Sequence, residues 1–488
     1  MPCRFSEGMV RVSPETIALA ILLVGVIALV GKYIRVRVRL VQKLFLPVSI
    51  IGGFLALFLG PEVLGRLADL VGISGLRDGG VFGAGVLDVW SELPGLLISA
   101  VFATMFLGAQ IPSPRRAVRL LGPQLSLGLT FASGQYVVGL VLTLLVLTPL
   151  FGVPHMFGAL IEIGFEGGHG TAAGMADVMT DLDFAGGGDL ALAMATVGIV
   201  SGVIIGVIVI NWAARTGRTE TFDARVEMSE SALTGLYNRY RRPYGSTLTV
   251  RPESLEALTF HVGIVAVAIL LGQTLLSGLQ AIENALWADS IEIFAYVPLF
   301  PLAMLGGVVL QLVAQQLGID DFISGKMMER IQGLSLDMLI ISALAALSLD
   351  AIAENIGAFA ILAIAGVGWN VFVLLYFTPR FIRRYWLERG IGDFGQSMGV
   401  TATGLLLMRM ADPENKSPAY EAFGYKQLVF EPFFGGGLVT AAAVPLIAQL
   451  GPYPLLIAMS VLLVLAIGSG LFYFGRRPEF AVEGRDSA

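Results

Sequence analysis

The sequence predicts an all-α polytopic membrane protein, and three observations support this fold class. Hydrophobic residues make up 56% of the 488 residues and charged residues only 14%, whereas soluble proteins carry about 25% charged residues. Eleven apolar runs have roughly the 20 residues that cross a bilayer as a helix. Two further apolar segments are rich in glycine, which predicts broken backbone buried in protein rather than helices that face lipid.

The eleven apolar runs are predicted to be transmembrane helices. They lie at residues 15–34, 44–64, 93–111, 123–151, 190–213, 255–279, 293–317, 334–350, 356–378, 428–450 and 453–474. The first run leads into a basic cluster rather than a small-residue cleavage site, so we expect it to be a membrane helix and not a cleaved signal. The two glycine-rich segments are residues 156–179 and 392–410.

Loop charges predict how these segments cross the membrane, because Lys and Arg mark the cytoplasmic side. Basic loops lie at residues 32–43, 113–119, 215–251 and 380–389 and in the tail at 476–477, whereas acidic loops lie at 61–92, 181–189, 283–292 and 350–354. With the N-terminus outside, the two kinds of loop fall on opposite sides only if neither glycine-rich segment crosses. We therefore expect two re-entrant hairpins, residues 156–179 from outside and 392–410 from the cytoplasm.

Short matches between the two halves of the chain predict inverted-topology repeats. Pro47 precedes Gly52-Gly53 with the spacing that separates Pro301 from Gly306-Gly307, and Thr171-Ala-Ala-Gly174 matches Thr401-Ala-Thr-Gly404. Repeats that meet at broken helices are typical of secondary transporters. The predicted units are residues 15–213 and 255–450, joined by a cytoplasmic linker at 214–254 and followed by an extra helix at 453–475. The C-terminus is then cytoplasmic, in the inner (plasma) membrane of a prokaryote.

Composition argues against metal or thiol chemistry. The chain has one cysteine, three histidines and neither an HExxH nor a CxxC motif, so no disulfide or thiolate metal site forms within one chain. An intramembrane enzyme that uses His169 and Glu166 as base and acid is an alternative, but no nucleophile with an orienting group accompanies them. We expect neither an enzyme nor a bound cofactor. A passive channel is a third alternative, which saturable exchange would distinguish from a transporter.

The segment Glu166-Gly167-Gly168-His169-Gly170-Thr171 resembles the Gly-Gly-His-Gly-Thr signature of the glutamate:sodium symporter family. Residues 393–404 are similar to a second Phe-Gly and Thr-rich segment of that family, and Gln135 stands where the family has a Gln. The resemblance implies sodium-coupled symport of glutamate or a similar acidic solute, an elevator-like movement and a homodimer. Departures from the family pattern are Glu166 in place of a small residue, Asp393, and Thr401-Ala402-Thr403 in place of Thr-Pro-Thr.

The two hairpins supply the expected binding residues. Half-helix N-termini offer free N–H groups to an anion, and we expect Thr171 and Thr401 to begin such half-helices. The predicted substrate-binding residues are Gln135, Gly167, Gly168, His169, Gly170, Thr171, Gly399, Thr401 and Thr403, and the predicted sodium or proton residues are Glu166, Ser397 and Thr401.

Several of these residues have an alternative role. The glycines are also typical of close helix packing, and His169 is also suited to bonding a backbone carbonyl. Gln135 and Asn370 are packing residues or site contacts. Three roles are open for Glu166. It lies at the water interface without a function, it binds a cation, or it carries a proton as the coupling residue of a transporter for another organic anion. Asp393 is expected at the interface, beside the basic loop at residues 380–389.

Overall fold

The computed structural model describes residues 13–43, 46–76, 79–109, 114–221, 234–237, 242, 244–246, 248–287, 294–412 and 416–476. Every regular element in these residues is helical. Nine helical stretches among them are long and apolar enough to cross a membrane. They are Pro14–Arg37, Val48–Val71, Ala84–Ala103, Leu120–Phe151, Gly187–Arg215, Ala257–Leu286, Leu299–Leu317, Ile356–Phe381 and Pro452–Phe474. The predicted fold class is confirmed. Of the 41 residues of the predicted linker at 214–254, 18 lie outside the described residues.

Two of the eleven predicted spans differ from the structure. The span at 334–350 belongs to a longer helix, α15 (Gly325–Ala345), whose first half carries several charges. The span at 428–450 was wrong, because two short helices replace it, α21 (Ala419–Phe430) and α22 (Leu438–Leu450). Gly435 and Gly436 between them have φ values of +69° and +101°, which no right-handed helix contains.

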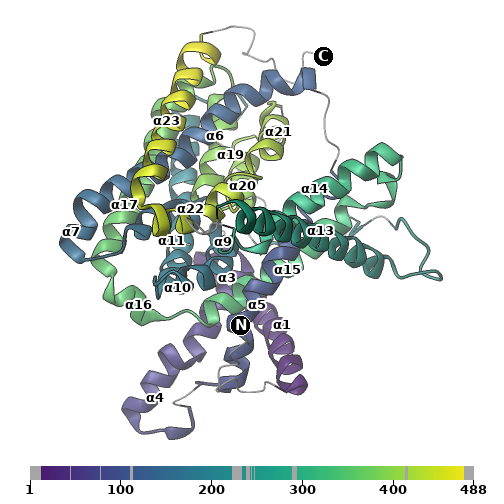
Figure 1. The fold of residues 1–488 in the computed structure, drawn as a ribbon, viewed down its shortest axis with the longest axis vertical. Helices are drawn as coiled ribbons and strands as arrows, with labels where there is room; N and C mark the ends of the chain where they lie inside the picture. The colour runs from purple at the N-terminus through teal and green to yellow at the C-terminus, as the bar shows by residue number, and fades with distance from the viewer. Residues whose placement is uncertain are drawn as a thin grey trace.

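The helices form two groups (Figure 1). The first group consists of α1 (Pro14–Arg37), α3 (Val48–Leu59), α5 (Ala84–Ala103), α13 (Ala257–Leu286), α14 (Leu299–Leu317) and α15. The second group consists of α6 (Pro114–Leu142), α8 (Leu160–Phe165), α9 (Gly168–Gly174), α10 (Ala176–Asp181), α11 (Gly187–Arg215), α17 (Ile356–Phe372), α19 (Trp386–Met398), α20 (Thr401–Ala411), α21, α22 and α23 (Pro452–Gly468). Figure 1 shows α13 and α14 projecting away from the second group.

The two Pro–Gly-Gly helices, α3 and α14, make matching contacts. Gly52 packs against Ile27 of α1 and Gly306 against Ala268 of α13, whereas Gly53 packs against Leu344 of α15 and Gly307 against Ala103 of α5. A side chain at Gly53, Gly306 or Gly307 would clash and one at Gly52 would be tightly packed, so the glycines allow the helices to approach closely. Each helix thus contacts the preceding helix of its own half and one helix of the other half. The internal repeat itself stays a prediction.

The first hairpin (residues 155–181) starts and ends near the beginning of α11. The Phe157 ring, in the short helix His155–Ala159, lies 6.3 Å from the Phe184 ring just before α11. From there α8 runs along α11 until Phe165 packs against Gly198, and α10 brings the chain back to Gly188. The segment therefore turns back without passing the middle of α11.

The second hairpin (residues 386–411) opens at the opposite end of α11. The Thr221 hydroxyl, which follows α11, lies 3.1 Å from the Glu388 carboxylate and 3.0 Å from the Ala411 carbonyl. This hairpin begins six residues earlier than the predicted start at 392. Residues 386–389 were expected in a basic loop, but they form the first turn of α19, where Glu388 and Arg389 are buried.

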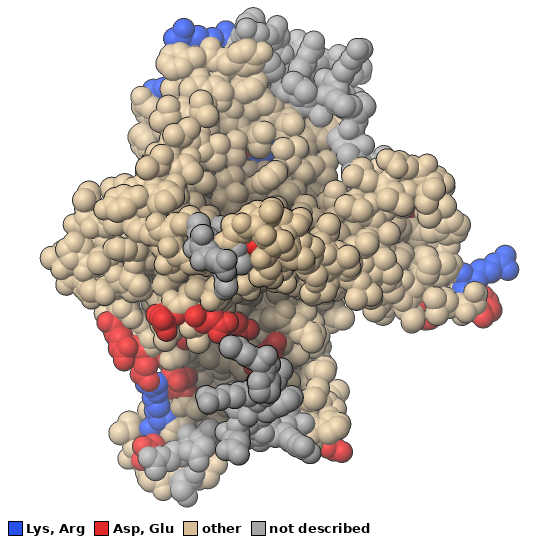
Figure 2. Space-filling view, in the orientation of Figure 1, with Lys and Arg blue, Asp and Glu red and all other residues tan. Residues whose placement is uncertain are grey.

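Exposed acidic side chains are concentrated on one part of the molecule (Figure 2), with Arg66 paired to Glu62 and Asp350 among them. Acidic side chains gather around α10 and α16 (Leu349–Glu354), and this acidic rim comprises Asp177, Asp181, Asp183, Asp350 and Glu354. Exposed Arg380, Arg383 and Arg476 belong to the far end, near the C-terminus of the described chain. The mouth of the first hairpin therefore lies on the acidic side.

Gly202 on α11 tests the contact between α11 and the second hairpin. A Cβ at Gly202 would lie 2.6 Å from the Met398 Cβ, whereas a Cβ at Gly263 of α13 would meet nothing within 4 Å. We expect Gly202→Ala to lower the free energy of unfolding by about 1–3 kcal/mol through overpacking. Gly263→Ala should leave stability unchanged or raise it by up to about 1 kcal/mol. Thermal unfolding of both purified variants in detergent measures the two changes in stability. Equal melting temperatures would contradict the close packing of Gly202 against Met398.

Candidate functional site

The tips of the two hairpins meet beside the middle of α11. Gly168 in the first tip has φ +68°, and a Cβ there would lie 2.9 Å from the Gly399 carbonyl oxygen in the second tip. Only glycine tolerates both this backbone conformation and this approach. The Met398 carbonyl also lies against Gly198 of α11. The predicted residues Gly167, Gly168 and Gly399 are thus brought together.

The two predicted half-helix starts have different outcomes. Thr401 is the first residue of α20, as predicted. Thr171 is the fourth residue of α9, because that helix begins at Gly168, so the predicted start at Thr171 was wrong. The Thr171 hydroxyl is buried, has no hydrogen-bond partner among the described residues and faces Gly436. Gly170 packs against Ile98 of α5 and so points away from the second tip.

The loop between α21 and α22, residues 431–437, covers the first tip. Gly435 lies against Glu166, and its N–H lies 3.2 Å from Glu162 Oε1. Gly436 packs against Thr171. Sequence reasoning missed this loop because the surrounding run is apolar. The signal available was Pro432 followed closely by three consecutive glycines.

Four carboxylates are buried around the tips: Glu162, Glu166, Asp393 and Glu431, each at most 5% exposed. Glu162 accepts hydrogen bonds from Tyr136, Thr440 and the Gly435 N–H, Asp393 accepts one from Gln124, and Glu431 accepts hydrogen bonds from Thr401 and Gln427. Buried carboxylates are tolerated when such donors compensate for the lost water. Asp393 was expected at the interface, and its complete burial corrects that prediction. The reason is that α19 begins at Trp386, which places Asp393 two turns inside the helix.

Glu166 differs from the other three carboxylates. Neither of its oxygens has a hydrogen-bond partner in the described part of the chain. Lys426 and the Ser397 hydroxyl are neighbouring side chains, but neither makes a hydrogen bond to it. Gln135 Oε1 and Ser397 Oγ also lack partners. Buried oxygens without hydrogen-bond partners are suitable ligands for a cation.

Two amide side chains hold the end of α19. Gln135 of α6 and Asn370 of α17 each donate to the Ser397 carbonyl at 2.8 Å. Gln135 also donates to Asn370 Oδ1 at 3.1 Å. Because α19 ends here, the Ser397 carbonyl accepts no hydrogen bond from the helix, and the two side-chain amides supply the missing donors. Both side chains thus help to hold the second tip, and a direct site contact of either one stays a prediction.

His169 bonds a side chain rather than a backbone carbonyl. Its Nε2 lies 3.0 Å from the Thr196 hydroxyl, which donates its own proton to the Leu192 carbonyl. Thr196 must then accept from Nε2–H, which assigns the neutral tautomer with a free Nδ1 acceptor. Nδ1 is buried and without a partner among the described residues. His169 thus offers a lone pair at the tip.

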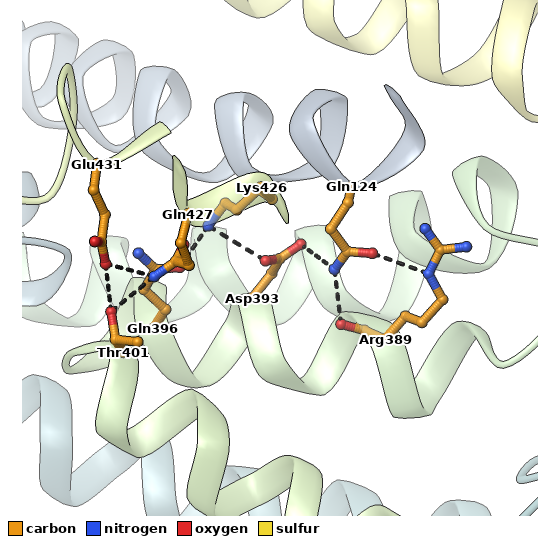
Figure 3. Close-up of polar contacts among 8 residues, drawn as sticks. All are labelled: Gln124, Arg389, Asp393, Gln396, Thr401, Lys426, Gln427 and Glu431. Atoms are coloured by element: carbon orange, nitrogen blue, oxygen red, sulfur yellow. Dashed lines mark hydrogen bonds and ion pairs between the residues drawn. The ribbon is translucent and has the colours of Figure 1, made fainter. Parts of the chain in front are cut away.

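A line of buried polar side chains continues from the second tip along α19 (Figure 3). It comprises Thr401, Glu431, Gln427, Gln396, Lys426, Asp393, Gln124 and Arg389. The Lys426 ammonium lies 3.4 Å from Asp393 Oδ1, and Arg389 bonds Gln124 Oε1 at 3.0 Å. Sequence reasoning missed Lys426. The signal available was Phe423 and Phe430, three residues before and four after it, whose rings flank the ammonium.

The remaining predicted residues are engaged with the protein. The Thr401 hydroxyl donates to Glu431 at 2.6 Å and accepts from Gln427 at 2.8 Å. Thr403 is buried, and its hydroxyl lies 2.8 Å from where a Gly399 Cβ would be. In the described residues no group of three or more His, Cys, Asp or Glu side chains is arranged to hold a metal ion.

Comparison with known proteins gives one family. The sequence model of the sodium/glutamate symporter family matches residues 14–409. The match includes both hairpin tips and ends before α21. No curated protein sequence matches the chain.

The amide pair on the Ser397 carbonyl predicts an energetic coupling. We expect Asn370→Leu to lower the free energy of unfolding by about 1–2 kcal/mol, since it removes one donor and leaves the Gln135 amide short of its partner. Adding Gln135→Leu should cost less than the sum of the two single changes, because both side chains share one carbonyl.

Unfolding of the two single variants and the double variant in detergent measures this coupling. Gln273→Leu on the exposed face of α13 is the matched control, because its amide makes only a 3.5 Å contact with Ser277. Additive effects of the two site changes would count against the shared-carbonyl arrangement.

Proposed function

Because the chain belongs to the sodium/glutamate symporter family, we propose that it carries glutamate or a similar acidic solute across the membrane together with sodium. The main structural support is the meeting of two hairpin tips from opposite ends of α11, beside the unpartnered carboxylate of Glu166. Broken helices that meet midway, away from both faces, are the arrangement that secondary transporters use. Family membership also argues against the enzymatic alternative.

We place the sodium ion between Glu166 and Ser397. Sodium takes oxygen ligands, and the Glu166 carboxylate, the Ser397 hydroxyl and Gln135 Oε1 are buried oxygens without partners among the described residues. Thr401 is the weaker candidate of the predicted set, because its hydroxyl already has a donor and an acceptor. Sodium is the coupling ion, and the proposal needs no other cofactor.

We place the solute against the two tips. The N-terminus of α20, which starts at Thr401 and has 11 residues, provides N–H groups and a favourable dipole for a carboxylate. The free Nδ1 of His169 accepts a hydrogen bond from an amino group, and Thr171 and Thr403 offer hydroxyls. Gly167, Gly168 and Gly399 allow the backbone to approach the solute closely. The remaining predicted contacts, Gln135 and Gly170, then act by holding the tips.

We propose that the second helix group moves against the first, as an elevator-like mechanism requires. Support comes from the interface, where Gly170 and Gly174 of α9 face apolar side chains, namely Ile98, Leu336 and Phe300. Apolar contacts exchange during sliding without breaking hydrogen bonds. We also propose that the first group forms the homodimer contact, because it contains two of the three spans whose apolar windows are least buried, α1 and α13, the third being α23.

The proposed orientation has the N-terminus outside and the C-terminus in the cytoplasm, in the inner membrane of a prokaryote. The separation of the acidic rim from the exposed arginines supports it (Figure 2). The inverted repeats of residues 15–213 and 255–450 are part of the same proposal, and the matching contacts of α3 and α14 support them. The helix α23 then follows as the extra C-terminal span.

Sodium-driven uptake is the direct test. Purified protein in liposomes should accumulate labelled glutamate when a sodium gradient is imposed, because the movement of one charge across 100 mV supplies about 2.3 kcal/mol in addition to the chemical gradient. Uptake should saturate with solute concentration and should exchange with unlabelled solute inside. Absence of uptake for every acidic amino acid tested would refute the proposed solute class.

Glu166→Gln separates sodium coupling from the alternative, in which Glu166 carries a proton. If Glu166 binds sodium, the variant should lose at least about tenfold in sodium-driven uptake, because the charged ligand is gone. If Glu166 carries a proton, uptake should persist in the variant but lose its dependence on pH. Glu253→Gln, at an exposed position outside the acidic rim, is the matched control and should behave as the wild type. A variant with unchanged sodium and pH dependence would exclude both roles.

A further inference from the structure

Lys426 is an ammonium group enclosed by the second helix group. Its side chain is completely buried and contacts Gln396 Oε1, Asp393 Oδ1 at 3.4 Å and the face of the Phe430 ring at 3.9 Å (Figure 3). Gly128 of α6 makes room for it, since a Cβ there would lie 2.5 Å from Lys426 Cε. The structure therefore provides a fitted position for one positive charge.

The charges around this position are unbalanced. The Lys426 ammonium pairs with one of the buried carboxylates, that of Asp393, at 3.4 Å. Arg389 is directed to Gln124 and the Leu120 carbonyl. A buried carboxylate without a partner is costly in its charged form. Glu431 and Asp393 are partly compensated by hydrogen bonds, whereas Glu166 is not.

We propose that Lys426 is a tethered cation that occupies a second cation position, formed by Asp393 Oδ1 and Gln396 Oε1. Lys426 then satisfies this position permanently, and Glu166 is left as the one carboxylate that takes an ion from solution. The inference rests on the proposed sodium coupling. It explains why one sodium ion, and not two, would bind at these carboxylates. Lys426, Asp393 and Gln396 lie on α21 and α19 of the same helix group, so the tethered charge travels with the site.

The position has the ligands that a free cation needs. Oδ1 of Asp393 has no hydrogen-bond partner among the described residues apart from its ion pair with Lys426. The Gln396 carbonyl oxygen already faces the ammonium. When the ammonium is removed, two oxygens that now contact a cation are left without one. A sodium ion from solution is expected to replace it.

Sodium-dependent stabilisation of the purified full-length protein tests this proposal without transport. The melting temperature is measured in detergent against sodium chloride, with choline chloride keeping the ionic strength constant. Mass action makes the slope of stability against the logarithm of sodium concentration proportional to the number of ions bound. We expect Lys426→Gln to be less stable without sodium and to show about twice the wild-type slope. Lys426→Arg, which keeps the charge, should retain the wild-type slope.

Asp393→Asn tests the same proposal in the opposite direction. With its first partner neutral, Lys426 is free to compensate Glu166, so the sodium-dependent slope should fall towards zero. The double variant Asp393→Asn/Lys426→Gln removes both charges and should return to the wild-type slope. Either single variant remains informative if the other does not fold.

The outcomes separate this inference from the proposed function. A wild-type protein whose melting temperature does not respond to sodium would overturn sodium coupling, and the tethered-cation role with it. A sodium response that is present in the wild type and identical in Lys426→Gln and Asp393→Asn would overturn the tethered-cation role alone.

Discussion

The carbonyl of Ser397, at the end of α19, is the point on which the arrangement of the site depends. Helices broken inside a membrane protein expose backbone groups that neither water nor lipid satisfies. Gln135 and Asn370 donate to this carbonyl from two different helices, so α6 and α17 are tied to the second tip. Because Ser397 is fixed, its hydroxyl stays beside Glu166, and Gly399 stays against Gly168. Loss of this pair of hydrogen bonds would loosen both tips.

Nearly all buried charges are compensated within the second helix group. Glu162, Glu431 and Asp393 obtain donors from α6, α20, α21 and the segment around α22, and Lys426 and Arg389 obtain acceptors from α19 and α6. A group whose polar contacts are internal is able to move as a unit without exposing a charge to lipid. Glu166 is the exception, because neither of its oxygens has a partner among the described residues, and under the proposed function the missing partner is the transported ion.

The hairpins and their opposite mouths were predictable from sequence, because glycine content and loop charge report on local backbone and on sidedness. Gly167, Gly168 and Gly399 lie where the two tips meet, whereas Thr171 was misplaced by three residues as a helix start because α9 begins at Gly168. The break at 431–437 and the burial of Lys426 were not predictable in this way. The loop at 431–437 lies within an apolar run, so composition does not reveal it. Burial of the Lys426 charge is unfavourable, and the contacts with Asp393 and Gln396 offset this; only the folded chain brings these residues close.

The acidic rim around α10 and α16 has a consequence for the order of events at the mouth of the first hairpin. Four exposed carboxylates of the rim, apart from Asp350, which pairs with Arg66, create a negative potential that reaches about 8 Å at physiological ionic strength. Cations are enriched in that layer and acidic solutes are depleted. Arrival at this face therefore favours the ion before the solute, and the difference in their encounter rates shrinks as inert salt is added.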